Sequence, residues 1–261
     1  MRFNRKQNFA TLSTTNDDLF TFSSVFIIHP IGTIFGIFHH DEACDISAFL
    51  DAPEDSEFNM DDVVCMVNTL QPGNNLAAAG YILYSSSTFL TMTIGHGVYG
   101  FTLDEQIGEF VLSHPCINLP DEMSIMSFNE ANWDLWDEPM QEVHASWRTG
   151  KSKVGKRYTS RYVGSMVADV HRTLLYGGVF GYPADTKNTD GKLRLLYEAA
   201  PMSFLIEQAG GLSTTGRTRI MDMTPDNVHQ RVPVVMGSKT EVQEVIDAYE
   251  KFDESQSKIN Q

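Results

Sequence analysis

Two segments in the second half of the chain have helical periodicity, and each ends close to a pair of glycines. In residues 161–176 apolar side chains recur every three or four positions, and the pattern stops at the glycine pair 177–178. A second predicted helix covers residues 193–208 and stops before the pair 210–211. Between the two, residues 179–182 are apolar and aromatic and predict a strand. Strands that alternate with helices are typical of an α/β architecture with sheets covered by helices.

The rest of the chain fits the same architecture and shows no internal repeat. Short β-branched and aromatic runs predict strands, and runs of good helix formers predict helices. The expected elements are a buried strand over 31–38, a helix over 76–84, a strand over 88–94, a hairpin of 98–103 with 110–112, a strand near 229–236 and an amphipathic helix over 240–249.

The charge of the chain is unevenly placed. No lysine or arginine lies between Gln7 and Trp147, whereas 21 of the 34 acidic residues do. The formal net charge of −15 argues against nucleic acid or an anionic membrane surface as a partner. No apolar run approaches the ~20 residues that a membrane-spanning helix needs, so we expect a soluble protein. Any cations that bind a phosphate must come from the second half of the chain.

The cysteines do not form a secreted disulfide framework. Cys44, Cys65 and Cys116 are too few and odd in number, which favours a reducing compartment. The first 22 residues, with three basic side chains and several serines and threonines, are faintly similar to an organelle-targeting peptide, although Asp17 and Asp18 argue against it.

The most informative segment for chemistry is residues 191–198. If the helix begins there, Lys192 and Arg194 lie in its first turn, where free backbone N–H groups and the helix dipole favour an anion. Glu198 follows one turn later and would place a carboxylate beside a bound phosphate, as a Mg²⁺ ligand requires. The alternative is an ordinary Arg194–Glu198 ion pair on an exposed helix face.

A second set of candidates consists of Arg161 and Tyr162, at the head of the other predicted helix, and Tyr182, at the end of the strand. An arginine fork and tyrosine hydroxyls are groups that bind phosphate oxygens. Helix capping and core packing explain the same residues equally well. We interpret His171, in the middle of the helix, as a packed or surface histidine. The sequence His-His-Asp-Glu at 39–42 has metal-ligand residue types without a recognised spacing.

Five long motifs also run in order along the chain, at residues 31–37, 71–81, 161–174, 191–198 and 229–231. Together they resemble class I fructose-1,6-bisphosphatase. The resemblance implies a Mg²⁺-dependent phosphatase that hydrolyses fructose 1,6-bisphosphate to fructose 6-phosphate and phosphate. It also implies a layered sugar-phosphatase fold of αβαβα type, N-terminally truncated here, in a homo-oligomer that is usually a tetramer.

The resemblance gives individual residues a role. Arg161 resembles the arginine that reaches into a neighbouring subunit's site, Met166 lines the sugar pocket and Glu198 resembles a metal ligand. Trp133 stands near the usual place of a phosphate-binding tyrosine, so that contact differs. The implied ligands of the sugar 6-phosphate are Asn129, Tyr162, Tyr182 and Lys192.

The plastid form of the family is the nearer match, and it carries an acidic insertion with regulatory cysteines. Cys44 and Cys65 lie in the corresponding loop, residues 41–70. A redox disulfide between them, regulation by thioredoxin and a place in the plastid stroma are therefore implied. Two unpaired thiols and a cytoplasmic location are the alternatives. The motifs behind this match lie at residues 84–87, 97–104 and 200–204.

We expect three parts in the chain. Residues 1–30 lie outside the family pattern and are interpreted as translated intron or a misplaced start. Residues 31–128 are a remnant of the N-terminal phosphatase domain, and residues 129–261 are a C-terminal α/β phosphosugar-binding domain.

The metal-binding acidic residues that precede residue 31 in the family are poorly matched. Asp17 is the weak candidate for the first carboxylate, and Phe20 replaces the second. Because phenylalanine cannot bind Mg²⁺, we expect this chain to bind a phosphosugar weakly and to turn it over very slowly. A non-catalytic phosphosugar-binding relative and a sedoheptulose-1,7-bisphosphatase are the alternative functions.

Overall fold

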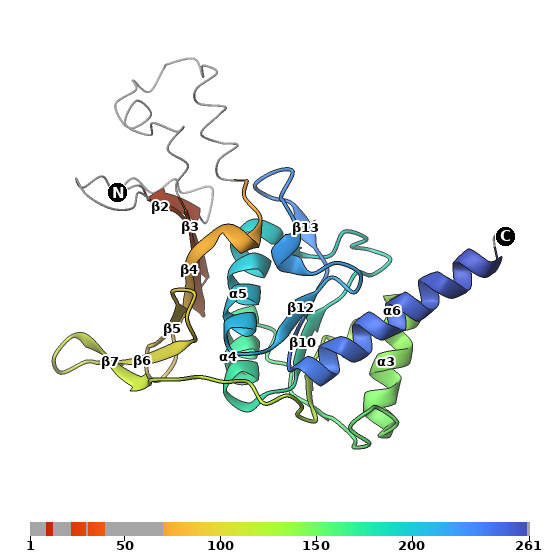
Figure 1. Ribbon diagram of the computed structural model, residues 1–261. Coiled ribbons are helices and arrows are strands. Elements are labelled where there is room, and N and C mark those ends of the chain that lie inside the picture. Colours follow the sequence, from red (N-terminus) through yellow and green to blue (C-terminus); the bar gives the residue numbers. More distant parts are fainter. Residues whose placement is uncertain (1–8, 13–21, 30, 40–69, 260–261) are drawn as a thin grey trace, which may run out of the picture.

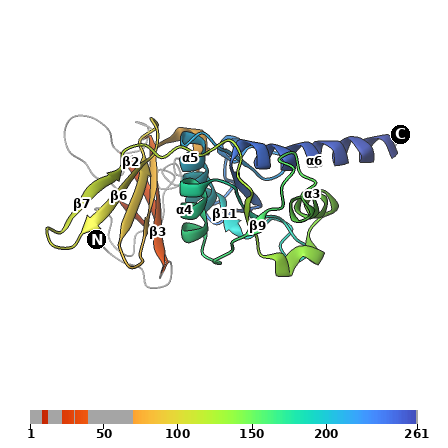
Figure 2. The same cartoon turned by 90° about the horizontal axis from the view of Figure 1, so that it is seen from below.

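The computed structural model describes residues 9–12, 22–29, 31–39 and 70–259. These residues form four layers, which follow one another as sheet, helices, sheet, helices (Figure 1 and Figure 2). The predicted α/β class with mixed sheets covered by helices is confirmed. The αβαβα order implied by the resemblance has one helical layer more than these four.

The first sheet is an antiparallel meander whose seven strands lie side by side in chain order. The strand predicted over 31–38 is β3, and the strand over 88–94 is β5. The predicted hairpin is also present, as β6 and β7. The strands are β1 (Phe9–Leu12), β2 (Phe22–His29), β3 (Gly32–His39), β4 (Leu76–Leu83), β5 (Phe89–Thr93), β6 (Tyr99–Asp104) and β7 (Glu109–His114).

The helix predicted over residues 76–84 is wrong, because this segment is the strand β4. Its Ala79 pairs with Gly36 of β3 on one side and with Thr93 of β5 on the other. A Cβ atom on Gly80 would lie 2.4 Å from Cζ of Phe35, so the small residue here permits a close approach of that ring. Helix propensity is worth less than about 1 kcal/mol per residue, and pairing on both edges of the strand overrides it.

The second sheet is mixed and has five strands in the order β12-β14-β10-β8-β9. The strand predicted over 179–182 is confirmed as β10, which pairs parallel with β8 and antiparallel with β14. The strand expected near 229–236 is two strands, β13 and β14, separated by Pro233. The bounds of the five strands are β8 (Ile125–Ser127), β9 (Thr159–Ser160), β10 (Val179–Tyr182), β12 (Leu212–Thr214) and β14 (Val234–Gly237), whereas β13 (Arg231–Val232) belongs to a separate two-stranded sheet.

Helices α4 (Met166–Tyr176) and α5 (Ala200–Gln208) lie between the two sheets, and α3 (Glu138–Thr149) and α6 (Lys239–Ile259) cover the outer face of the second sheet (Figure 2). The last helix extends well beyond the predicted end at residue 249, and its C-terminal part projects from the body (Figure 1). Short turns complete the chain: η1 (Gly73–Asn75), η2 (Glu130–Leu135) and η4 (Ile220–Asp222).

Both long helices of the second half begin later than predicted. Helix α4 begins at Met166 and not at residue 161, because Gly164 has a φ of +87° and interrupts the helical backbone. Helix α5 begins at Ala200, after the short strand β11 (Leu193–Arg194) and one π-helical turn, η3 (Leu195–Ala199). Pro201, in the first turn of α5, lacks an N–H and cannot bond to the carbonyl four residues earlier.

The core fills the spaces between the layers. Between the sheets, Leu174 of α4 and Met202 of α5 are fully buried together with Phe180 of β10. Between the second sheet and the outer helices, Trp147 and Val245 are fully buried.

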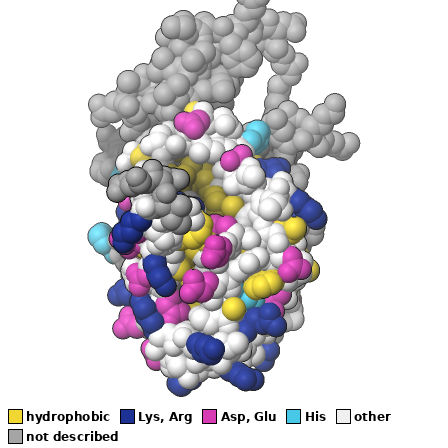
Figure 3. All heavy atoms as spheres, turned by 90° about the vertical axis from the view of Figure 1, so that its right-hand side faces the viewer, with side chains coloured by type: hydrophobic (Ala, Val, Ile, Leu, Met, Phe, Trp, Pro, Cys, Tyr) yellow, Lys and Arg dark blue, Asp and Glu magenta, His cyan; other side chains and the backbone are white. Residues whose placement is uncertain are grey.

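The face near α3 and α6 carries acidic and basic side chains interspersed (Figure 3), in keeping with the nearly balanced charge of the second half. Among the described helices, none combines the length and the apolar character needed to cross a membrane.

Candidate functional site

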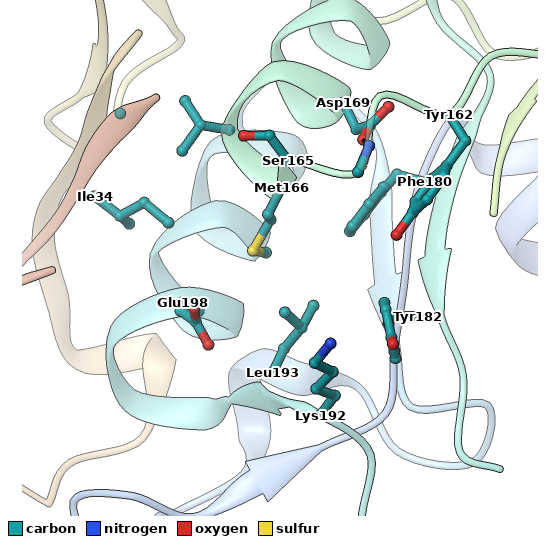
Figure 4. Close-up of a pocket in the computed structure, with 13 residues that line it drawn as sticks. Ile34, Tyr162, Ser165, Met166, Asp169, Phe180, Tyr182, Lys192, Leu193 and Glu198 are labelled. Carbon is teal, nitrogen blue, oxygen red and sulfur yellow. Dashed lines mark hydrogen bonds between the residues drawn. The ribbon is translucent and has the colours of Figure 1, made fainter. Parts of the chain in front are cut away.

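A cavity of about 210 Å³ lies where β3, α4, β10 and the segment before η3 meet. Both apolar side chains, among them Ile34, Met166 and Phe180, and polar groups line it, with Phe180 beside Tyr162 and Glu198 on the side of Ile34 (Figure 4). The polar residues that line it come from three stretches of the chain: Tyr162, Ser165, Asp169, Tyr182, Lys192 and Glu198.

The cavity brings together three of the four predicted 6-phosphate ligands, Tyr162, Tyr182 and Lys192. The Lys192 ammonium lies 5.2 Å from the centroid of the Tyr182 ring. Tyr162 lies on the same side of the cavity as Tyr182, and its hydroxyl points toward Tyr182 (Figure 4). Two hydroxyl donors and one ammonium at one end of a cavity can bind an anionic group of the size of a phosphate.

Tyr162 keeps its proton across the physiological range. Partial burial raises the pKa of its hydroxyl, and Tyr182 and Asp169 raise it further through their negative charge when ionised. The hydroxyl is therefore a hydrogen-bond donor at neutral pH.

Two predicted ligands, Asn129 and Arg161, are not among the residues that line this cavity. Asn129 precedes η2 and makes no side-chain capping bond. Arg161 is exposed, and its Nη1 donates to the carbonyl of Ser160 at 3.0 Å. An exposed Arg161 agrees with the idea that it serves a neighbouring subunit, which stays a prediction. Trp133 packs against the core between α3 and the second sheet.

The prediction that Lys192 and Arg194 lie in the first turn of a helix is wrong. Lys192 precedes β11, and Arg194 belongs to it and is the N-cap of the π-helical turn η3, so neither lies within the first turn of a helix. The backbone N–H of Arg194 donates to Oε2 of Glu198 at 2.7 Å, and its guanidinium donates to the carbonyl of Lys192 at 3.2 Å. Lys192 nevertheless lines the cavity, because β11 pairs with β13 and orients this segment.

The described residues do not complete a metal site. Among them, no cluster of three or more histidine, cysteine, aspartate or glutamate side chains is placed to hold an ion. Two carboxylates line the cavity, Glu198 and Asp169, and Asp169 is already surrounded by protein donors. Because protein donors already occupy the oxygens of Asp169, these two carboxylates do not supply the several oxygen ligands that Mg²⁺ requires. Asp17, Cys44 and Cys65 lie outside the described residues.

Sequence reasoning missed Asp169, which is fully buried at the cavity wall. It accepts hydrogen bonds from Ser127, Val163, Gly164 and Arg172. A signal was available, because Asp169 lies three residues after Met166 on the side of the predicted helix that should be apolar.

The interpretation of His171 as a packed histidine is confirmed. Its Nδ1 and the hydroxyl of Tyr81 share a hydrogen bond of 2.8 Å, and its ring contacts Phe89 edge to face. Burial, and after it the charge of His114, lower the pKa of His171 to about 4. His171 is therefore neutral at pH 7 and ties the first sheet to α4.

Two family models match almost the whole chain. The model of the fructose-1-6-bisphosphatase C-terminal domain matches residues 119–250, and that of the N-terminal domain matches residues 3–115. The second match begins within residues 1–30, the segment that the sequence reasoning set apart. The boundaries of the three predicted parts, and the origin of residues 1–30, stay predictions.

Several named proteins are similar to this chain. Chloroplastic fructose-1,6-bisphosphatase of Spinacia oleracea is 49% identical over 215 residues, which are 82% of this chain and 51% of that protein. Fructose-1,6-bisphosphatase class 1 of Nitratidesulfovibrio vulgaris is 50% identical over 191 residues, 72% of this chain and 57% of that one. The chain thus spans about half the length of the curated relatives it matches.

A solved structure shares the fold. The crystal structure of Leishmania major fructose-1,6-bisphosphatase in holo form matches with a TM-score of 0.72 and 41% sequence identity. The match covers 87% of this chain and 63% of that one.

Proposed function

Because the chain belongs to the fructose-1,6-bisphosphatase family, we propose that the protein hydrolyses fructose 1,6-bisphosphate to fructose 6-phosphate and phosphate, and that the cavity holds the 6-phosphate end. The observation that supports this most is the convergence of Tyr162, Tyr182 and Lys192 from three segments on one end of one cavity.

The chemistry of the cavity suits a phosphosugar. A phosphate at the polar end takes donated hydrogen bonds from the two hydroxyls and charge from the ammonium. The apolar side chains of Met166 and Leu193 give the carbon skeleton of the sugar a surface to pack on. The described residues thus bind the 6-phosphate, which does not react, and position the rest of the substrate. Slow turnover by this chain stays a prediction, which rests on Phe20 at the place of a metal-binding carboxylate.

Binding can be tested with the products and a neutral sugar. Isothermal titration calorimetry on the purified chain should show fructose 6-phosphate binding well above fructose, which lacks the phosphate. Equal affinities for the two would contradict the assignment of the phosphate site. Phosphate release from fructose 1,6-bisphosphate and from sedoheptulose 1,7-bisphosphate, measured with Mg²⁺, tests hydrolysis and substrate choice. Absence of any release would contradict the hydrolytic part.

We extend the proposal to partners and location on the strength of the relatives. We propose Mg²⁺ as the cofactor, a homo-oligomer, and thioredoxin acting on Cys44 and Cys65, as the family resemblance implies. The similarity to chloroplastic proteins supports a plastid location. The bacterial relative at 50% identity leaves the cytoplasm as the alternative location. Thiol titration of the unfolded chain with and without reductant tests the disulfide, and equal thiol counts would exclude it.

A further inference from the structure

We propose that Asp169 is a positioning residue, whose buried carboxylate fixes residues 161–164 so that Tyr162 faces the cavity. Its effect on ligand binding rests on the proposed function, whereas its effect on the segment does not. Asp169 and Tyr162 lie at the same end of the cavity (Figure 4).

The carboxylate of Asp169 holds the C-terminal side of Tyr162. Oδ1 accepts from the backbone N–H of Val163 at 3.0 Å, and Oδ2 accepts from the N–H of Gly164 at 2.9 Å. Gly164 turns the chain into α4 with a positive φ, so the two N–H groups converge on one acceptor. A fully buried carboxylate is costly unless it is paired and hydrogen-bonded, and these bonds meet that requirement.

Two further donors connect the carboxylate to the rest of the fold. The hydroxyl of Ser127, the last residue of β8, donates to Oδ1 at 2.8 Å. Nη1 of Arg172, one turn farther along α4, donates to the same oxygen at 3.1 Å. Asp169 thereby joins the second sheet, the helix and the segment that carries Tyr162.

The N-terminal side of Tyr162 is held by β8 and by Arg172, which also bonds to Asp169. The N–H of Arg161 donates to the carbonyl of Met126 at 2.8 Å, and the carbonyl of Arg161 accepts from Nη1 of Arg172 at 2.5 Å. Tyr162 itself is 38% exposed, so core packing does not fix its ring. The direction of the Tyr162 side chain is therefore set by the residues on its two sides. Arg161 is held by β8 and Arg172, and residues 163–164 are held by Asp169.

Only a carboxylate can serve this set of donors. An asparagine offers one acceptor oxygen, and its amide nitrogen would face a backbone N–H, donor against donor. The change would release at least one of the two N–H groups and remove the charge opposite Arg172. Asp169→Asn should therefore loosen residues 163–164 while the packing around α4 stays in place.

The experiment compares Asp169→Asn with Glu244→Gln. Glu244 is a matched control, because its carboxylate is also buried and accepts hydrogen bonds from the backbone N–H of Lys153 and from Nε1 of Trp147. It lies on α6 and does not line the cavity. Amide hydrogen exchange followed by NMR measures the exchange rates of the N–H groups of Val163 and Gly164. Titration with fructose 6-phosphate measures the Kd. Thermal denaturation measures the loss of stability of each variant.

For Asp169→Asn we expect exchange at Val163 and Gly164 to accelerate, and the Kd for fructose 6-phosphate to rise, each on the order of tenfold. Glu244→Gln should lower the melting temperature and leave both quantities unchanged. Wild-type exchange in Asp169→Asn would overturn the proposal, and so would an equal loss of affinity in Glu244→Gln. If the wild-type chain binds no fructose 6-phosphate while exchange still accelerates in Asp169→Asn, the proposed function fails and the positioning of the segment stands.

A second variant covers the case in which Asp169→Asn does not fold. Arg172→Gln removes the guanidinium that joins Asp169 to the carbonyl of Arg161 and leaves the carboxylate in place. It should accelerate exchange at Val163 and Gly164 to a smaller degree. Unchanged exchange in this variant would contradict the proposal.

Discussion

Replacing Lys192 with methionine should weaken phosphate binding without unfolding the protein. Methionine keeps the length and much of the apolar stem and removes the charge. The ammonium lies at the polar end of the cavity, 5.2 Å from the centre of the Tyr182 ring, and the side chain is exposed to solvent. Its removal should therefore cost binding free energy and little stability.

The size of the effect follows from the exposure of the ammonium. A unit charge pair 4 Å apart is worth roughly 4 kcal/mol at an effective dielectric constant of about 20. Desolvation and competition with water reduce this to the net value of a hydrogen bond to a charged group, about 1.5–3 kcal/mol. Because Lys192 is exposed, we expect the lower end, about 1.5 kcal/mol, which corresponds to roughly a tenfold rise in Kd.

Calorimetric titration with fructose 6-phosphate at two ionic strengths measures the loss of affinity and shows whether it is electrostatic. The wild-type affinity should fall as salt is added, because salt screens the attraction between the Lys192 ammonium and the phosphate. The affinity of Lys192→Met should depend less on salt, because this variant lacks that charge. Lys187→Met is the matched control, because Lys187 is an exposed lysine nearby in the chain that does not line the cavity. Wild-type affinity and salt response in Lys192→Met would refute the assignment of the phosphate end.

Three further predictions concern the cavity and the fold. Tyr182→Phe should raise the Kd for fructose 6-phosphate and leave the Kd for fructose unchanged, and a calorimetric result in which both rise equally would point to lost packing instead of a lost hydroxyl. Gly80→Ala should lower the free energy of unfolding by about 1–3 kcal/mol, because the new methyl group meets the ring of Phe35, and a urea titration that shows no loss would contradict the strand assignment. Burial lowers the pKa of His171 to about 4 from an unfolded value of 6.5, so the unfolded state binds more protons between these values, and stability should fall as pH drops from 6.5 to 4. His171→Gln should make the melting temperature less dependent on pH in that range, and an unchanged profile would exclude His171 as a source.

The sequence predicted the class of the fold and most of the elements, and its errors have physical causes. Strands with β-branched and aromatic residues, such as β3 and β5, were predicted correctly because their composition and pattern agree. Strand β4 was mistaken for a helix because its alanines are good helix formers, and only pairing with β3 and β5 decides its structure. Such pairing partners are distant in sequence and carry no local signal.

The site was predicted in part. The resemblance selected Tyr162, Tyr182 and Lys192, which the fold gathers in one cavity. The local argument for Lys192 was wrong, since it assumed a helix that begins only at Ala200. Asp169 was missed because its partners, two backbone N–H groups and side chains from β8 and α4, come together only in the folded chain.

A crystal structure of the chain with fructose 6-phosphate tests the central claim most directly. The account predicts the phosphate within hydrogen-bonding distance of the hydroxyls of Tyr162 and Tyr182 and of the ammonium of Lys192, with the sugar against Met166. A phosphate bound elsewhere on the chain, with these three groups turned away from it, would contradict the account.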